Sequence, residues 1–430
     1  MVFPHWIHST TKYILIGVGL LCASECTWCL YKKFFQRKIQ CRGGASKSIA
    51  EVLFFSEECE RCRNHANTNK PCSLASCPLR NLNKVIEYLG TATTSVDVCV
   101  YFLTCNVIIK AIIDLRRRNI LVRVITDDES TGNDISQVLI MRKAGIKVRC
   151  RRSESFYLMH HKFVIVDKKL LISGSANWTM QAFYGNSENI LITNHNDIVV
   201  QYMKEFENLW LEFSGEVDAN SSSNIEVNLS SMSQKEKQCT DGTSEPIAEV
   251  LFFSKKCASC RNHANSNIPC SLASCPLTNL NKVIGYIETA TKTVDVCVYM
   301  LTCNAIVKAI IDLQRKNVFI RVISDNDSCG NDASQALNMQ KSGIKVRCRK
   351  STCLMHHKFV IVDKKLLISG SANWTMQAFY GNYENILLTN HSDIVVQYLA
   401  EFDKLWVKLG DEVNINFPNN ITRRPFQNGN

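Results

Sequence analysis

The sequence predicts the α/β fold class, with two layered α/β domains in one chain. Each domain is a mixed sheet flanked by helices, and an N-terminal transmembrane helix precedes both. Residues 49–150 align with residues 247–348 at a constant offset of 198. In each copy, strand-like apolar runs alternate with amphipathic helical patterns, which indicates layered α/β domains. A run of 19 largely apolar residues, 13–31, precedes both copies.

The repeat sets the domain boundaries. Residues 158–186 equal residues 354–382 letter for letter, and two copies of about 165 residues fit the usual size of a domain. Residues 214–246 are rich in Ser, Asn and charge, which is typical of a flexible linker. The predicted organisation is a tail 1–12, an anchor 13–31, a basic segment 32–47, a first domain 48–213, the linker 214–246, a second domain 247–410 and a tail 411–430.

Hydrophobic periodicity places the elements of the first domain in order, and the second domain repeats them. Pro78 suits a first helical turn, and Gly145 suits a helix end. Predicted strands cover residues 51–56, 96–103, 120–126, 147–150, 163–166 and 188–193. Predicted helices cover residues 79–89, 106–117, 133–144 and 196–212.

The N-terminal apolar run is long enough to cross a membrane. Tyr13–Tyr31 contains one charge, Glu25, and as a helix it would span about 28 Å. Five cations follow it and only Lys12 precedes it, so both domains should face the cytosol. The alternative is a cleaved signal peptide ending near Ala23, but its basic cluster would lie on the wrong side.

Net charge and cysteine count indicate which partners the protein binds and which state its cysteines adopt. A net charge of +11 favours anionic partners, either nucleic acid or acidic lipid, without separating them. The odd count of 21 cysteines and the cytosolic placement favour thiols and metal over disulfides.

A Cys/His cluster recurs in each domain, within residues 59–77 and 257–275. Thiolates and imidazole at short spacings suit a tetrahedral structural zinc, which needs four of the five candidates. The alternative is a loop of free thiols, or disulfides in another compartment. The candidate ligands are Cys59, Cys62, His65, Cys72 and Cys77, and Cys257, Cys260, His263, Cys270 and Cys275.

A second motif, H-x-K-x4-D-x6-G-S-x-N, also occurs once in each domain. Histidine titrates near neutrality, so it can act as nucleophile in one domain and as acid in the other. Lysine supplies positive charge for phosphoryl oxygens, and asparagine adds a neutral donor. These residue types therefore suit chemistry at a phosphodiester, and none of the roles given to them requires a catalytic cofactor. The catalytic candidates are His160, Lys162, Asp167, His356, Lys358 and Asp363.

The remaining motif residues receive supporting roles. Asp167 lies at an odd separation from His160, so we interpret it as a structural or hydrogen-bonding partner rather than an acid. The serines are expected to bring hydroxyl and backbone N–H groups to the phosphate, and the glutamates to orient a histidine across the site. His161 and His357 are expected to be structural. The phosphate-binding or orienting candidates are Ser175, Asn177, Glu188, Ser371, Asn373 and Glu384.

These motifs, with the runs EVLFF, VRVITD, RKAGIKVR, MHHKFVIVDKK and GSANWT, resemble the phospholipase D superfamily. More narrowly, the chain is similar to the mitochondrial cardiolipin hydrolase, or Zucchini-type endonuclease, group. The resemblance implies a single-pass protein of the mitochondrial outer membrane with cytosolic domains, a zinc element and one active site across a two-fold axis. The tandem fusion implies that the two domains pack as a pseudo-two-fold dimer within one chain, while a further homodimer stays open.

Three functions follow from the motif and the resemblance. The first is a metal-independent single-strand RNA endonuclease, of the piRNA-producing type, that forms a phosphohistidine. The second is hydrolysis of cardiolipin to phosphatidic acid, and the third is a non-catalytic membrane-anchored scaffold. Four aromatic residues serve a substrate or the core: Phe156, Tyr157, Trp178 and Tyr184. Six basic residues steer an RNA backbone or form an ordinary solvated surface: Arg149, Arg151, Arg152, Arg347, Arg349 and Lys350.

Overall fold

The structure, a computed structural model, describes residues 48–56, 62, 77–127, 137–151, 157–214, 246–254, 260, 275–325, 335–349 and 353–410. The predicted anchor, most of the predicted linker and six of the ten candidate zinc ligands lie outside these residues. Within the described ranges, none of the helices has the length and apolar character needed to span a bilayer.

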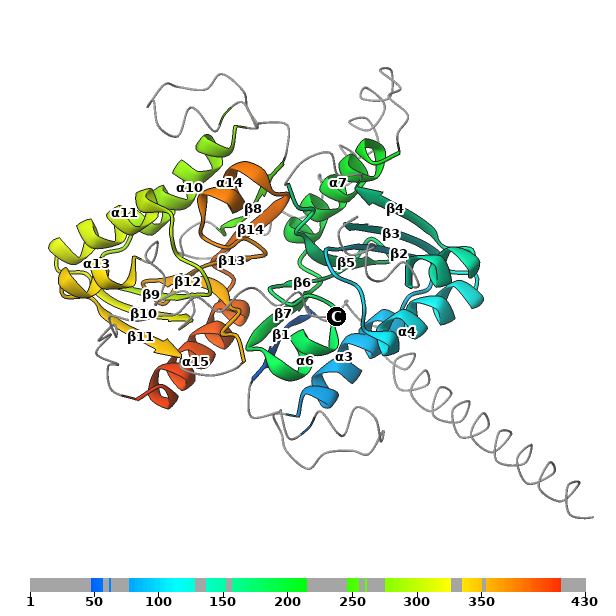
Figure 1. Cartoon of the computed structure of the whole chain (residues 1–430), viewed down its shortest axis with the longest axis horizontal. Helices are drawn as coiled ribbons and strands as arrows, with labels where there is room; N and C mark the ends of the chain where they lie inside the picture. Colours follow the sequence, from blue (N-terminus) through cyan, green and yellow to red (C-terminus); the bar gives the residue numbers. More distant parts are fainter. Residues whose placement is uncertain are drawn as a thin grey trace, which may run out of the picture. The chain divides into compact units, whose positions relative to one another are not determined.

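The first lobe, defined as the described residues 48–214, contains a seven-stranded mixed sheet in the order β1-β7-β6-β5-β2-β3-β4 (Figure 1). Strands β2, β3 and β4 are parallel, and the remaining neighbours are antiparallel. The elements are β1 (Ala50–Phe55), α3 (Pro78–Gly90), β2 (Ser95–Val100), α4 (Asn106–Arg117), β3 (Leu121–Asp127), β4 (Lys147–Arg151), β5 (Lys162–Val166), β6 (Leu170–Gly174), α6 (Met180–Gly185), β7 (Glu188–Thr193) and α7 (Asn196–Glu212).

The second lobe, defined as the described residues 246–410, repeats this topology in the order β8-β14-β13-β12-β9-β10-β11. Its elements are β8 (Ala248–Phe253), α10 (Pro276–Glu288), β9 (Thr293–Val298), α11 (Asn304–Arg315), β10 (Phe319–Asp325), α13 (Ala336–Lys341), β11 (Lys345–Arg349), β12 (Lys358–Val362), β13 (Leu366–Gly370), α14 (Met376–Gly381), β14 (Glu384–Thr389) and α15 (Ser392–Lys408). The prediction of two mixed-sheet α/β domains is therefore confirmed.

Local patterns predicted most elements closely. The predicted helices 106–117 and 196–212 and the predicted strand 188–193 match α4, α7 and β7. Two elements were missed, β6 and α6, each only five or six residues long. The predicted strand 96–103 ends early, at Val100, because the chain then leaves the sheet and only Leu103 forms a bridge, to Trp178.

Each sheet is covered on both faces. In the first lobe, Val98 and its same-face neighbours pack with α3 and α4, whereas Cys99 points to the opposite face, where α7 packs. Trp178 and Tyr184 are buried core residues, so the structure assigns these two aromatics to the core. Phe156 lies outside the described residues.

The second face is shared by both lobes. One hydrophobic cluster contains residues of both, among them Phe163 and Tyr202 with Phe359 and Tyr398. Helix α7 contacts β8 of the second lobe, and α15 contacts β1 of the first. Gln201 in α7 accepts from Val250 N at 2.9 Å and donates to Ala248 O at 2.8 Å, closing the edge of β8.

Candidate active site

The two motif histidines lie where each lobe meets the other. His160 precedes β5, and its backbone N–H donates to Tyr383 O of the second lobe at 3.0 Å. The reciprocal bond joins His356 N to Ser187 O at 2.9 Å. Isolated bridges Met159–Tyr383 and Ser187–Met355 extend this contact. The backbone before each motif strand is therefore fixed by the opposite lobe.

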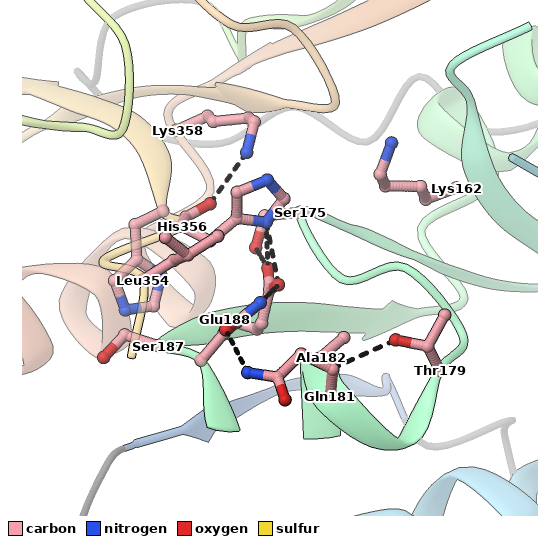
Figure 2. A network of polar contacts seen from close by, with 12 residues as sticks. Lys162, Ser175, Thr179, Gln181, Ala182, Ser187, Glu188, Leu354, His356 and Lys358 are labelled. Atoms are coloured by element: carbon pink, nitrogen blue, oxygen red, sulfur yellow. Dashed lines mark hydrogen bonds and ion pairs between the residues drawn. The ribbon is translucent and has the colours of Figure 1, made fainter. Parts of the chain in front are cut away.

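Each histidine is bonded to a glutamate of the opposite lobe. His160 Nδ1 lies 2.8 Å from Glu384 Oε1. The equivalent distance from His356 Nδ1 to Glu188 Oε1 is 2.7 Å, and Figure 2 shows this second contact. Both glutamates are fully buried. A buried carboxylate accepts the Nδ1 proton, so each neutral ring keeps its lone pair on Nε2. Among the described residues, neither Nε2 has a hydrogen-bond partner, so both are available to a substrate.

Burial controls the charge of these histidines. It lowers the pKa of His160 to about 4, although the charge of Glu384 opposes the shift. It also lowers the pKa of His356, against the charge of Glu188. For Glu188, burial raises the pKa, but the charge and hydrogen bond of His356 outweigh it and the pKa falls below its ordinary value. Both rings are thus neutral at pH 7 before an anion binds.

The two lysines are buried beside the histidines. Lys162 Nζ donates to His160 O at 2.8 Å and lies 5.5 Å from the ring centroid of Tyr101. Burial lowers its pKa to about 7, with Glu384 opposing and Lys358 of the other lobe adding to the shift. Burial lowers the pKa of Lys358 to about 8. Burial disfavours the charged form of both lysines, and a bound phosphate anion would compensate for this, so the two side chains are suited to binding phosphate.

Ser175 supports Glu188. Its Oγ donates to Glu188 Oε2 at 2.6 Å and accepts from Asn189 N at 3.0 Å, and its own N–H donates to Asn189 O at 3.0 Å. Ser371 repeats this contact with Glu384 at 2.6 Å. The expectation that these hydroxyl and N–H groups face a phosphate is therefore wrong, because all of them are hydrogen-bonded to the glutamates or to the neighbouring strand. The orienting role remains.

The glycine of the motif allows two strands to approach closely. A Cβ on Gly174 would lie 2.0 Å from Asn189 O, and the same clash occurs between Gly370 and Asn385. Only glycine fits where β6 passes β7 at this distance. Its position brings Ser175 against Glu188 at the start of β7.

The motif asparagines have unsatisfied side chains. Asn177 Oδ1 and Asn373 Oδ1 are buried and have no hydrogen-bond partner among the described residues. These oxygens are acceptors, as are phosphoryl oxygens, so only the Nδ2 group of each asparagine can donate to a phosphate. These amides remain the candidate phosphate-binding groups of the motif.

Asp167 lies at the far end of β5 from Lys162. Its carboxylate accepts from Thr93 N at 2.8 Å, Thr94 N at 2.7 Å and Ser95 N at 2.9 Å. Asp363 does the same with Thr291, Lys292 and Thr293. The structure separates both aspartates from the histidines and makes them anchors of the turn before β2 and β9.

A second pair of histidines forms the floor below the site. His161 Nδ1 lies 2.9 Å from Asn385 Nδ2, and that asparagine accepts from Tyr202 OH at 2.9 Å. His357 forms the equivalent contact with Asn189 at 3.0 Å. No role was predicted from the sequence for these asparagines and tyrosines. The Glu-Asn pair that begins both β7 and β14 was the available signal.

Two of the four described candidate arginines are buried in contacts within the protein. Arg151 is buried and pairs with Asp127 at 2.9 Å, and Arg349 is buried with Nη1 2.6 Å from Ser187 Oγ. Arg149 and Arg347 stack over Trp210 and Trp406, at 4.2 and 4.1 Å. Burial of Arg151 and Arg349 contradicts both proposed roles of these two residues, the steering of RNA and the solvated surface. Arg149 and Arg347 are only partly buried, so their role in steering RNA stays a prediction. Arg152 and Lys350 lie outside the described residues.

Two candidate zinc ligands of each cluster lie within the described residues. Cys62 and Cys77 are buried at the edge of the first core, and Cys260 and Cys275 pack together beside Leu277. Paired buried thiols fit a structural zinc. The other candidates, Cys59, His65, Cys72, Cys257, His263 and Cys270, lie outside the described residues. One cysteine departs from the expected thiol state: Cys348 in β11 is disulfide-bonded.

Comparisons with known proteins agree with this site. A family profile described as "Cardiolipin synthase, PLD-like domain" matches residues 85–210 and again residues 283–406. "Mitochondrial cardiolipin hydrolase" of Xenopus laevis is 40% identical over 172 residues, which cover 39% of this chain and 79% of that protein. The Chlamydomonas reinhardtii protein of the same name is 36% identical over 164 residues, covering 37% of this chain and 73% of its own.

A solved structure shows the same two-lobe fold. Phosphatidylserine synthase of Haemophilus influenzae matches 75% of this chain and 83% of its own, with a TM-score of 0.51 and 14% identity. The family profile matches more than half of the chain, once in each lobe. The chain therefore belongs to the phospholipase D superfamily, carries its PLD-like domain in duplicate, and is a phosphodiesterase of that superfamily.

Proposed function

We propose that the two lobes form a pseudo-two-fold pair with a single active site, which hydrolyses a phosphodiester through a phosphohistidine. The observation that carries this proposal is the reciprocal bonding of His160 to Glu384 and of His356 to Glu188. Neither lobe alone supplies both a histidine and the carboxylate that orients it. The alternative of a non-catalytic scaffold has no observation in its favour, because the catalytic groups are assembled.

The reaction divides between the two histidines. Nε2 of one attacks phosphorus, and the bond from phosphorus to the leaving oxygen breaks. The other histidine, protonated once the anionic diester is bound, gives its proton to that oxygen. It then removes a proton from water, which attacks the phosphohistidine and releases the phosphomonoester. Lys162, Lys358 and the amides of Asn177 and Asn373 hold the phosphoryl oxygens.

Cardiolipin is the substrate that we favour, with phosphatidic acid as the product. The relatives at 36–40% identity carry the name cardiolipin hydrolase. In addition, two of the arginines expected to steer RNA, Arg151 and Arg349, are buried instead. Single-strand RNA is the second candidate, because a net charge of +11 favours a polyanion.

Three accompanying features belong to the same proposal. Tyr13–Tyr31 would anchor the chain in the mitochondrial outer membrane, with both lobes in the cytosol. A structural zinc in each lobe would be held by four of the five clustered Cys and His residues and would brace the segment before α3 or α10. Pairing of the lobes within the chain would make a second chain unnecessary for the active site.

The test uses the full-length chain in detergent with EDTA present, on cardiolipin vesicles and on end-labelled single-strand RNA. His160→Ala and His356→Ala are compared with Lys169→Ala, an exposed residue close to the motif. We expect each histidine variant to lose ~10²–10⁴-fold in turnover of cardiolipin, and the lysine variant to keep it.

Each other outcome has a definite meaning. If both histidine variants retain about half the activity, the lobes contain independent sites and the shared site is refuted. If RNA is cleaved and cardiolipin is not, the proposal of a shared active site is retained and the assignment of cardiolipin as substrate is refuted. If wild type turns over neither substrate, hydrolysis of these diesters is refuted.

A further inference from the structure

A second cluster of metal-ligating side chains joins the lobes, away from the active site. His195 and Asp197 flank the start of α7, and His391 and Asp393 flank the start of α15. His195 Nε2 lies 3.2 Å from Asp393 Oδ2, and His391 Nε2 lies 3.1 Å from Asp197 Oδ2. Each histidine thus meets the carboxylate of the opposite lobe.

The two pairs are held against each other. The imidazoles of His195 and His391 are stacked, with centroids 4.1 Å apart and planes 12° apart. One ligand atom each from His195, Asp197 and His391 lies within 4.8 Å of the others. Hydrogen bonding alone would be satisfied by two separate pairs. The ligand atoms of His195, Asp197 and His391 nevertheless come from both lobes. A metal ion lies in the plane of each imidazole that binds it, so both rings must turn out of the stack to bind one ion.

The distances are close to those of a zinc coordination shell. Zinc bonds of about 2.0–2.2 Å at tetrahedral angles place neighbouring ligand atoms roughly 3.3–3.5 Å apart. Both observed histidine–carboxylate distances, 3.2 and 3.1 Å, are near this value. Bringing ligand atoms of His195, Asp197 and His391 from 4.8 Å to this spacing needs shifts of up to about 1.3 Å. Asp393 lies outside this group of three and must move to join it, and all four side chains are 18–46% exposed.

Charge and access also favour a divalent cation. The two carboxylates carry two negative charges, which one divalent ion would balance. Asp197 Oδ1 accepts from Ile198 N at 3.0 Å, so the start of α7 occupies one oxygen and leaves Oδ2 facing His391. Both carboxylates are nearly half exposed, so an ion can enter from solvent.

We propose that His195, Asp197, His391 and Asp393 form a zinc site that clips the two lobes together. It differs from the Cys/His clusters in its ligands and from the active site in its position. Glu188 begins β7 at the active site, whereas His195 follows the other end, about 20 Å further along the chain. Two imidazoles and two carboxylates are a ligand set that zinc accepts.

The test compares the full-length chain with His195→Gln/His391→Gln. Glutamine still donates a hydrogen bond to a carboxylate but is a poor zinc ligand, so the variant separates a metal site from a hydrogen-bonded clasp. Both proteins are stripped, reloaded with Zn²⁺ and analysed for metal per chain. Lys168→Gln/Lys364→Gln, at two exposed turn positions, is the matched control.

We expect wild type and control to bind one more zinc per chain than the histidine variant, because the Cys/His clusters are unchanged. With Co²⁺, the difference spectrum should lack the sulfur-to-cobalt band of a thiolate site. Zn²⁺ added after the thiol sites are filled should raise the Tm of wild type and of the control, and should leave the Tm of the histidine variant unchanged. Equal zinc content, or an equal Tm response, overturns the proposal.

A second variant keeps the test decisive if the double variant does not fold. If circular dichroism shows that the double variant is unfolded, Asp393→Asn replaces it, because this side chain is 46% exposed. A tenfold or greater loss of affinity for the additional zinc supports the site. Unchanged affinity overturns it.

Discussion

His160 Nδ1 and Glu384 Oε1 lie 2.8 Å apart although the residues are 224 positions apart in the chain. The equivalent contact of His356 with Glu188 runs in the opposite direction between the lobes. Ser175 and Ser371 hold the two carboxylates, and Gly174 and Gly370 allow those serines to approach. Orientation of each histidine therefore depends on both lobes.

The cross-lobe pairs should be energetically coupled. In a double-mutant cycle of His160→Ala and Glu384→Gln, followed by urea unfolding, we expect a coupling free energy of ~1–3 kcal/mol. Removing one partner leaves the other buried with one hydrogen bond fewer, although Ser371 still donates to Glu384, and removing both relieves that cost. The control cycle pairs His160→Ala with Glu188→Gln of the same lobe. A larger coupling in the control than in the cross-lobe cycle would contradict the assigned pairing.

Activity should fall on the alkaline side as the lysines lose their charge. Burial lowers the pKa of Lys162 to about 7 and that of Lys358 to about 8. Each lysine is charged below its pKa, so kcat/KM for an anionic diester should decrease as pH rises through 7 to 8, reflecting the free enzyme. A profile that stays flat up to pH 10 would show that neither charge is needed.

Substrate binding should draw a proton into the site. The pKa of His160 is lowered to about 4 by burial, so this ring is neutral at pH 7 until an anion arrives. A bound phosphate analogue such as vanadate adds negative charge and raises the pKa of the nearby histidine. Calorimetry at pH 7 in buffers of different ionisation enthalpy should detect uptake of up to about one proton. Proton release on binding would be inconsistent with neutral histidines in the free site.

Asp167 should contribute to stability and not to chemistry. Asp167→Asn removes charge-assisted bonds to Thr93, Thr94 and Ser95, and should lower the free energy of unfolding by about 1 kcal/mol at this exposed turn. Asparagine tolerates the φ of 51° there. Asp114→Asn, on an exposed helix, is the control.

The pH dependence of this contribution has a fixed sign. Hydrogen bonds from Ser95 and its neighbours, working against burial, lower the pKa of Asp167 to about 2 from 3.8. The stabilisation is therefore complete above pH 4 and is lost as pH falls through 2. Retained kcat is expected in Asp167→Asn, and a large loss of kcat without a loss of stability would restore Asp167 as a catalytic residue.

Gly174→Ala should be strongly destabilising. The added Cβ would lie 2.0 Å from the carbonyl oxygen of Asn189, so β6 and β7 must separate, at a cost of about 3 kcal/mol or more. Gly285→Ala is the matched control, because nothing lies within 4 Å of its Cβ and helix α10 should gain ~0.5–1 kcal/mol. Thermal unfolding of both variants measures the contrast. Equal Tm values would refute the close approach.

Much of the fold was predictable because periodicity is a local property. Helices α4 and α7 and strand β7 were predicted at their observed bounds, since apolar spacing fixes which face is buried. Strand β6 and helix α6 were missed because five or six residues give too short a pattern to separate strand, helix and loop. The motif residues were found because their chemistry and spacing occur together twice.

The sequence by itself determined the duplication, the α/β class and the groups that carry phosphodiester chemistry. Only the tertiary structure decided which residues act together. Glu384 meets His160, Ser175 holds Glu188, and two of the candidate arginines, Arg151 and Arg349, are buried. The physical reason is that helix and strand patterns follow from interactions a few residues apart, whereas the active site forms where two separately folded cores bury a common face.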